Sequence, residues 1–424
     1  MRILVISRSA WRRDNSTGNT LTDFFCGMGE AEIFSLCMRE QPPQNGIAMR
    51  HFYISEKQMI KRFLGKKAAV GAEHIGESLD DGLEKAMYDA AKKHPSYLLF
   101  FAREFLWDVG GWKNENLRRY IREIDPDVLF FPTFGCYYPH KLLRYLHTLT
   151  DAKIVLFHAD DHYTLRQWSL SPVYWLYRFG LRKWMQRSAR IADLQYCISD
   201  IQKADYDKAF GCECKVLTKF QNFSGEPLLK MNYGNPLQLV FTGNINVNRW
   251  KSLEMLAKVL ERINVDGTKA QLRIYTATPL TKAMQTALSK EGTSYLMGSV
   301  TSAEIPRIQR EADMLVHAEA TDLKSRLTVR QSFSTKIVDY LKAARPIVAV
   351  GPENVASIKH LIDNNCAITA DNEQQLYEKM LSVLTDTQQL HRYAMQAYMC
   401  GRKHHDEIQQ KAMLQRDLYR LADM

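Results

Sequence analysis

The stretch Gln331-Ser-Phe-Ser-Thr-Lys-Ile-Val-Asp-Tyr-Leu-Lys-Ala-Ala-Arg-Pro-Ile-Val-Ala-Val-Gly351-Pro352 decides the fold class of this chain. After a polar turn, Ile337, Val338 and Leu341 follow one another at helical spacing, and Pro346 then ends the pattern. A short β-branched run follows and stops at the Gly-Pro pair. The stretch therefore predicts a loop, a helix, a buried strand and a second loop.

The start of this predicted helix is a candidate anion site. Unpaired backbone N–H groups and the positive end of the helix dipole gather there, so Ser334, Thr335 and Lys336 would face a bound anion. A phosphate group is the expected ligand.

Bulk composition favours a large α/β protein with anionic partners. The chain has 424 residues, 46% of them hydrophobic, and a formal net charge of +10. This length predicts two domains with cores of their own. The eight cysteines show no paired zinc-type spacing, so we expect reduced thiols and no metal.

Strands and helices alternate along the second half of the chain. Apolar runs at 237–242, 271–275, 295–297 and 314–317 are predicted strands, separated by helical patterns. This alternation is typical of a parallel sheet with helices on both faces. The proline- and glycine-rich stretch 224–236 before it is a predicted linker.

The deciding stretch resembles the donor segment of retaining glycosyltransferases of family 4, which have the GT-B fold. That segment reads Glu, seven residues, Glu, an alanine-rich helix end, Pro and a hydrophobic strand. Asp339 stands at the second acid and Gln331 replaces the first. The resemblance implies that Asp339 accepts a hydrogen bond from ribose and that Phe333 belongs to the same donor-binding turn.

A second family feature lies after the strand at 237–242. The family has Gly-Arg there and a Lys five residues after the Arg, and these two bases hold the donor diphosphate. This chain has Gly243, Asn244 at the Arg position and Arg249 at the Lys position, with Lys251 close by. The resemblance also places the nucleotide base and ribose against two further strand ends, which carry Thr276 and Ser299.

The first half predicts three buried strands, at 2–7, 127–132 and 153–158. The third ends at His158, and Asp160 and Asp161 follow. These are candidate acceptor-side catalytic groups, with His158 as base or orienting group; the alternative is that His158 only caps a strand. Gly18 in the polar loop after the first strand is a donor-facing candidate, or part of an ordinary turn.

The implied architecture is α/β, with two Rossmann-like domains that face a central cleft. We predict an acceptor domain over 1–225, a donor domain over 236–404, and a C-terminal helix, about 405–424, that returns to the first domain. The implied catalytic groups are His158, Asp160, Asp161, Arg249 and Lys336.

The implied activity is transfer of a sugar, with retention, from a nucleoside-diphosphate sugar to a glycan or lipid-linked acceptor in polysaccharide biosynthesis. The donor is a substrate, and no cofactor is expected. A sugar-nucleotide epimerase and a non-catalytic nucleotide-sugar-binding relative are the alternatives. Nucleic acid is a poor candidate partner, because the basic residues are dispersed.

Residues 171–190 interleave aromatic residues with Arg178, Arg182, Lys183, Arg187 and Arg190. A packed amphipathic helix, with Leu176 on its apolar side, explains this pattern. A peripheral contact with an anionic membrane is the alternative. No apolar run reaches the roughly 20 residues of a spanning helix. We therefore expect a cytoplasmic protein, either free or attached to the inner face of the membrane.

Overall fold

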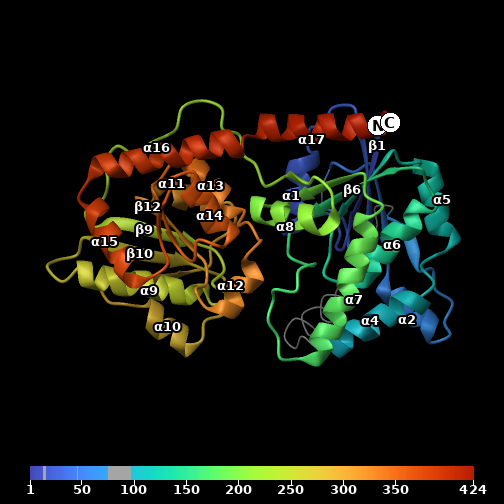
Figure 1. Cartoon of the computed structure of the whole chain (residues 1–424), viewed down its shortest axis with the longest axis horizontal. Helices are drawn as coiled ribbons and strands as arrows, with labels where there is room; N and C mark the ends of the chain where they lie inside the picture. The colour runs from blue at the N-terminus through green and yellow to red at the C-terminus, as the bar shows by residue number, and fades with distance from the viewer. Residues whose placement is uncertain (13–15, 45, 75–96) are drawn as a thin grey trace. The chain divides into compact units, whose positions relative to one another are not determined.

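The computed structural model describes residues 1–12, 16–44, 46–74 and 97–424. These residues form two compact units: residues 1–217 with 411–424, and residues 218–410. Each unit is built on a sheet with helices on both faces (Figure 1). The expectation of two Rossmann-like sheets is therefore confirmed.

The described residues of the first unit contain an eight-stranded sheet in the order β4-β3-β2-β1-β5-β6-β7-β8. The β3–β4 pair is antiparallel and the other pairs are parallel. The strands are β1 (Arg2–Ser7), β2 (Glu32–Cys37), β3 (Arg50–Ile54), β4 (Gly71–Glu73), β5 (Val128–Pro132), β6 (Lys153–His158), β7 (Leu194–Cys197) and β8 (Lys215–Val216). The helices are α1 (Ser16–Phe25), α2 (Glu56–Phe63), α4 (Tyr97–Val109), α5 (Glu115–Ile124), α6 (Tyr137–His147), α7 (Pro172–Ala189), α8 (Asp200–Phe210) and α17 (Glu407–Ala422).

The second unit has a six-stranded parallel sheet, among the described residues, in the order β11-β10-β9-β12-β13-β14. Helices α9 and α15 cover one face, and α11, α13 and α16 cover the other (Figure 1). The strands are β9 (Leu237–Thr242), β10 (Ala270–Tyr275), β11 (Ser294–Gly298), β12 (Met314–Ala318), β13 (Ile347–Val350) and β14 (Ile368–Ala370). The helices are α9 (Arg249–Ile263), α10 (Lys282–Leu288), α11 (Ile305–Glu311), α12 (Leu323–Val329), α13 (Lys336–Ala343), α14 (Ala356–Asp363), α15 (Glu373–Leu384) and α16 (Thr387–His404).

Central strands are continuous apolar runs because helices cover both of their faces. In β1, residues 3–6 are fully buried, and so are all four residues of β13. The stretch Gln331–Pro352 folds as predicted into a turn, the helix α13 and the strand β13. Within the described ranges, no helix combines the length and apolarity that crossing a bilayer requires.

The last helix, α17, packs in the first unit, as predicted. Leu414 and Leu418 are fully buried, and the carboxylate of Asp417 is nearly so. Asp417 accepts hydrogen bonds from the Tyr196 hydroxyl on β7 at 2.7 Å and from the Lys215 amine on β8 at 2.6 Å. Helix α17 is therefore bound to β8, the edge strand of the first sheet, and to its neighbour β7.

We expect Asp417→Ala to lower the free energy of unfolding of the first unit by about 2–3 kcal/mol. The substitution leaves the buried Tyr196 hydroxyl and the Lys215 ammonium without their acceptor. Thermal and urea denaturation would measure the loss, with the exposed Asp423→Ala as control. Equal stability of the two variants would contradict the assigned role.

Candidate functional site

The carboxyl ends of β9 and β12 and the start of α13 meet at one edge of the second sheet, because parallel strands end at the same edge. Gly243 follows β9 and has a φ of +139°, which favours glycine. A Cβ added there would lie 1.5 Å from the Nζ atom of Lys336. The Lys336 amine also lies 5.7 Å from the centre of the Phe241 ring. A side chain at position 243 would therefore displace the Lys336 amine from its present position.

Arg249, the first residue of α9, connects three segments of this edge. Its Nε atom is 3.0 Å from Oε2 of Glu319, which follows β12, and its Nη1 atom donates to Oδ1 of Asn244 at 3.1 Å. Glu319 is buried and lies 3.4 Å from Nε2 of His317. Burial alone would raise the pKa of Glu319, but His317 and Arg249 bring it below its usual value. Glu319 therefore holds Arg249 in place as a carboxylate.

The charged form of Lys336 is disfavoured at this edge. Burial, followed by the positive charge of Arg249, lowers its pKa from 10.5 to about 8. Two cationic side chains thus share one edge with the carboxylate of Glu319, which is paired with Arg249, and that of Asp339, which is bound to Lys219. A bound anion would relieve the repulsion and form charge-assisted hydrogen bonds with both cations.

The turn before α13 is partly occupied by the protein itself. The backbone N–H of Ser334 donates to Oγ of Ser357 at 2.9 Å, and Thr335, the N-cap residue, makes no side-chain capping bond. Phe333 is buried, with its ring stacked on His405 at 5.4 Å and edge-on to His360 at 5.2 Å. The helix begins at Lys336, so this lysine is placed in its first turn.

Asp339 lies one turn further along α13. Its Oδ1 atom accepts hydrogen bonds from Nζ of Lys219 at 2.6 Å and from Nε2 of Gln221 at 3.0 Å. A ligand hydroxyl that approached this carboxylate would compete with both donors.

Three other donor-side candidates lie at neighbouring strand ends or on the helix surface. Thr276 follows β10; its N–H donates to the carbonyl of Gly298 at 2.8 Å. Ser299 follows β11 and is exposed. Lys251 is exposed in the first turn of α9.

The candidates of the first unit are mostly engaged in its own packing. His158 is fully buried at the end of β6, with Nδ1 3.1 Å from Oγ1 of Thr133 and Nε2 3.0 Å from Oε1 of Gln195. Burial lowers its pKa to about 4, so the ring is neutral near pH 7. Both ring nitrogens thus have partners inside the unit, which favours the alternative that His158 has a packing role.

Asp160 and Asp161 differ in their surroundings. Asp160 is exposed. Asp161 is buried; its Oδ1 atom accepts the N–H of Thr164 at 2.8 Å and lies 3.2 Å from Nη2 of Arg178. Asp161 therefore fixes the loop between β6 and α7.

Gly18 is buried in the first turn of α1. This helix begins at Ser16, so Gly18 belongs to the helix and not to the predicted loop. A Cβ at this position would lie 1.9 Å from the carbonyl oxygen of Arg12. Residues 13–15 of the predicted loop lie outside the described residues.

Three residues of this edge, Glu319, Lys219 and Gln221, are not among those predicted from the sequence. Glu319 carried a signal, since it is an acidic residue in the buried apolar run that continues β12. Lys219 and Gln221 lie well over a hundred residues before Asp339, and no spacing rule links them.

Comparison with known proteins gives a family for the second unit. Residues 236–386 match the family described as glycosyl transferases group 1. No curated protein matches the sequence.

Solved structures resemble the whole chain. Anabaena HepE in complex with UDP superposes with a TM-score of 0.62 at 13% identity, covering 99% of this chain and 100% of that one. Sucrose-phosphate synthase from Thermosynechococcus elongatus gives 0.63 at 9%, covering 99% and 98%. The UDP-forming α,α-trehalose-phosphate synthase from Burkholderia xenovorans gives 0.61 at 11%, covering 99% and 100%. At these identities the likeness shows a shared fold.

The lowered pKa of Lys336 predicts a pH dependence of stability. The unfolded chain binds this proton more tightly than the folded chain, so the penalty is complete below about pH 8 and is lost as pH rises toward 10.5. Wild type should therefore gain about 3 kcal/mol over this window relative to Lys336→Met. Urea unfolding at several pH values measures the difference. Lys251→Met should keep the wild-type slope, and parallel curves for wild type and Lys336→Met would contradict the assignment.

Proposed function

Since residues 236–386 form a domain of the glycosyl transferases group 1 family within a chain of the GT-B fold, we propose that this glycosyltransferase takes its sugar from a uridine diphosphate sugar. HepE, which shares the fold, forms complexes with UDP and with UDP-glucose. The observation that carries the proposal is the pair of cations, Arg249 and Lys336, at the carboxyl edge of the second sheet.

In our proposal this edge binds the diphosphate of the donor. Arg249 is oriented by Glu319, and Lys336 is fixed beside Gly243, so neither side chain needs to reorganise when the anion arrives. The free end of the α13 helix at Thr335 adds the positive end of its dipole. In our proposal these groups replace the Arg–Lys pair of the family. This chain has Asn244 at the Arg position of that pair.

Sugar transfer requires the diphosphate to leave while oxocarbenium character grows on the sugar. Preorganised cations and N–H groups stabilise the departing charge, and this is often the largest catalytic contribution. Arg249 and Lys336 would make that contribution here. Asp339 would exchange its bond with Lys219 or Gln221 for one with a ribose hydroxyl.

The acceptor is proposed to be a glycan or a lipid-linked oligosaccharide, in polysaccharide biosynthesis. Support for a membrane-bound acceptor comes from α7. Leu176, predicted to lie on the packed side, is 66% exposed, and Phe179 is 49% exposed. Lys183, Arg187 and Arg190 follow at helical spacing on the same face and are exposed. Apolar residues followed by bases are typical of a helix that lies on an anionic bilayer.

Donor binding tests the proposal directly. We expect UDP to raise the melting temperature of wild type, and Lys336→Met to weaken UDP binding at least about tenfold, since a charge-assisted hydrogen bond contributes roughly 1.5–3 kcal/mol. Near pH 8 the bound anion should also raise the pKa of Lys336, so wild type takes up protons on binding. Calorimetry in buffers of different ionisation enthalpy measures this uptake.

The exposed Lys251→Met is the matched control and should bind UDP within about threefold of wild type. Binding without proton uptake in wild type would contradict the role of Lys336. Absence of UDP binding would contradict the proposed donor. Product analysis with the donor alone separates transfer from epimerisation, and tight binding without turnover across an acceptor panel would favour a binding protein.

The proposed membrane contact of α7 predicts that substitutions on its exposed face weaken vesicle binding. Leu176→Glu with Phe179→Glu should reduce cosedimentation with vesicles that contain phosphatidylglycerol at least about fivefold, because apolar burial and charge attraction are both weakened. Leu381→Glu, at an exposed position on α15, is the control. Equal sedimentation of both variants would argue for a soluble acceptor.

A further inference from the structure

Four polar side chains in the second unit contact one another in series, and two of them, His360 and His405, pack against Phe333. Nε2 of His405 lies 3.1 Å from Nε2 of His360 on α14, and the same His360 atom lies 3.5 Å from Sγ of Cys400 on α16. Cys366, which precedes β14, adjoins Cys400 and is the main influence on its pKa, and the Cys366 thiol also donates to the carbonyl oxygen of Leu361 at 3.6 Å. Two imidazoles and two thiols thus form a continuous series.

The surroundings of His405 fix where the protons lie. Its Nδ1 atom lies 2.9 Å from Oγ1 of Thr218 and 3.2 Å from the carbonyl oxygen of Lys219. The Thr218 hydroxyl can itself donate to that carbonyl at 3.1 Å, so a hydrogen on Nδ1 satisfies all three contacts. Nε2 of His405 is then an acceptor when the ring is neutral, and burial lowers the pKa of His405 to about 3. The hydrogen between the two rings therefore belongs to Nε2 of His360. That N–H is shared between His405 and the sulfur of Cys400.

These neighbours favour the thiolate form of Cys400. The hydrogen bond from Cys366, followed by the contact with His360, lowers the pKa of Cys400 to about 5. The interaction between the two thiols raises the pKa of Cys366. The carboxyl end of α16 opposes a negative charge at this position. Arg402, Lys403 and His404 in the same last turn offset that effect.

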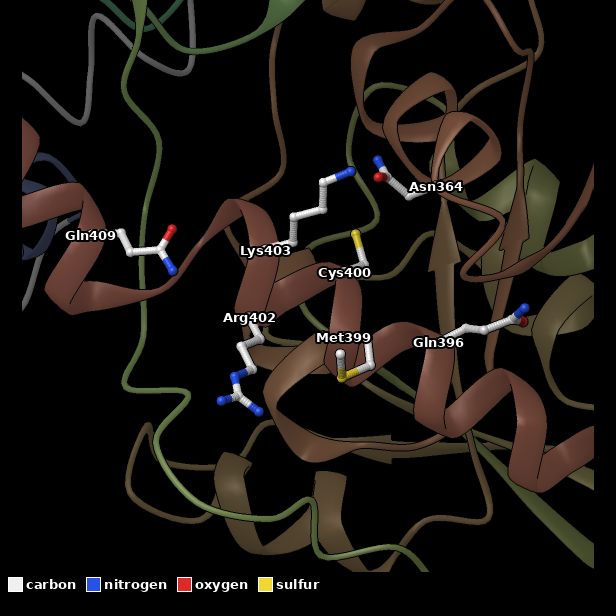
Figure 2. A pocket seen from close by; sticks show the side chains of 7 residues that line it. All are labelled: Asn364, Gln396, Met399, Cys400, Arg402, Lys403 and Gln409. Atoms are coloured by element: carbon white, nitrogen blue, oxygen red, sulfur yellow. The ribbon is translucent and has the colours of Figure 1, made fainter.

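A pocket gives access to this sulfur. Its volume is about 480 Å³, and it is lined by Asn364, Gln396, Met399, Cys400, Arg402, Lys403 and Gln409. Figure 2 shows the thiol of Cys400 pointing to the same side as the Lys403 amine and the Asn364 amide. The lining has two basic residues and no acidic one. A small polar or anionic reagent can therefore reach a thiol whose residue is only 5% exposed.

We propose that Cys400 is a modification site, a nucleophilic thiol that small electrophiles and hydroperoxides reach through this pocket, with Cys366 as its resolving partner. The geometry that carries the proposal is the 3.5 Å contact of Cys400 with His360 and the basic pocket, and Cys366 is the neighbouring thiol. The proposal is independent of the sugar-transfer function.

With hydrogen peroxide the reaction has two steps. The Cys400 sulfur attacks one peroxide oxygen; an S–O bond forms, the O–O bond breaks, and the departing hydroxide takes a proton and leaves as water. The sulfur of Cys366 then attacks the sulfur of the sulfenic acid; an S–S bond forms, and the hydroxide leaves as water with the Cys366 proton. Two thiols lose two electrons in total, and one peroxide gains them.

Labelling of the reduced wild-type protein tests the nucleophile without any substitution. At about pH 6 an exposed thiol with an ordinary pKa near 8.5 is almost entirely protonated. We expect brief treatment with iodoacetamide at this pH, followed by peptide mass spectrometry, to modify Cys400 at least about tenfold more than the exposed Cys26. His360→Ala should reduce this preference, because it removes one of the groups that lower the pKa of Cys400. Greater labelling of Cys26 in wild type would overturn the proposal.

Peroxide treatment tests the resolving thiol. Wild type should lose two hydrogens and give a peptide pair joined through Cys366 and Cys400. Cys366→Ser should instead accumulate a dimedone adduct on Cys400. Cys212 and Cys214, whose Sγ atoms lie 3.7 Å apart, are the rival pair. Oxidation of that pair with Cys400 still reduced would overturn the proposal, and Cys212→Ser should leave the Cys366–Cys400 product unchanged.

Discussion

The ion pair between Arg249 and Glu319 organises the candidate donor edge of the second unit. A buried carboxylate is costly unless it is paired, and Glu319 meets this need with Arg249 on one side and His317 on the other. The pair fixes the guanidinium at the start of α9, where its charge adds to the larger effect of burial in lowering the pKa of Lys336. The site therefore has an excess of positive charge in place before any ligand arrives.

The fold was predictable because its signals are local. The alternation of strands and helices after residue 237 follows from burial on both faces of a parallel sheet, and each element carries its own apolar period and its own breaker. Element ends were less accurate: the apolar pattern of the sequence predicts a helix from Leu253, whereas α9 begins four residues earlier at Arg249.

The site was only partly predictable because its contacts are not local. Gly243, Asn244 and Arg249 were predicted together because the family resemblance covers one short loop, and Lys336 was predicted from the helix start. The partner of Asp339 is Lys219, which comes from the segment before the second sheet. His158 shows the opposite case: a histidine at a strand end suggests chemistry, but the side chains of Thr133 and Gln195 that occupy its nitrogens become visible only in three dimensions.

The fastening of α17 to β7 and β8 affects how the protein is made. The first unit is assembled from both ends of the sequence, whereas all of residues 218–410 are contiguous. A ribosome therefore delivers every residue of the second unit before it delivers Asp417. Domains usually fold in the order of their synthesis. Here the first unit receives its last helix only after the second unit has been translated. Until then the Tyr196 hydroxyl lacks its acceptor, and the surface that Leu414 and Leu418 cover is exposed to solvent.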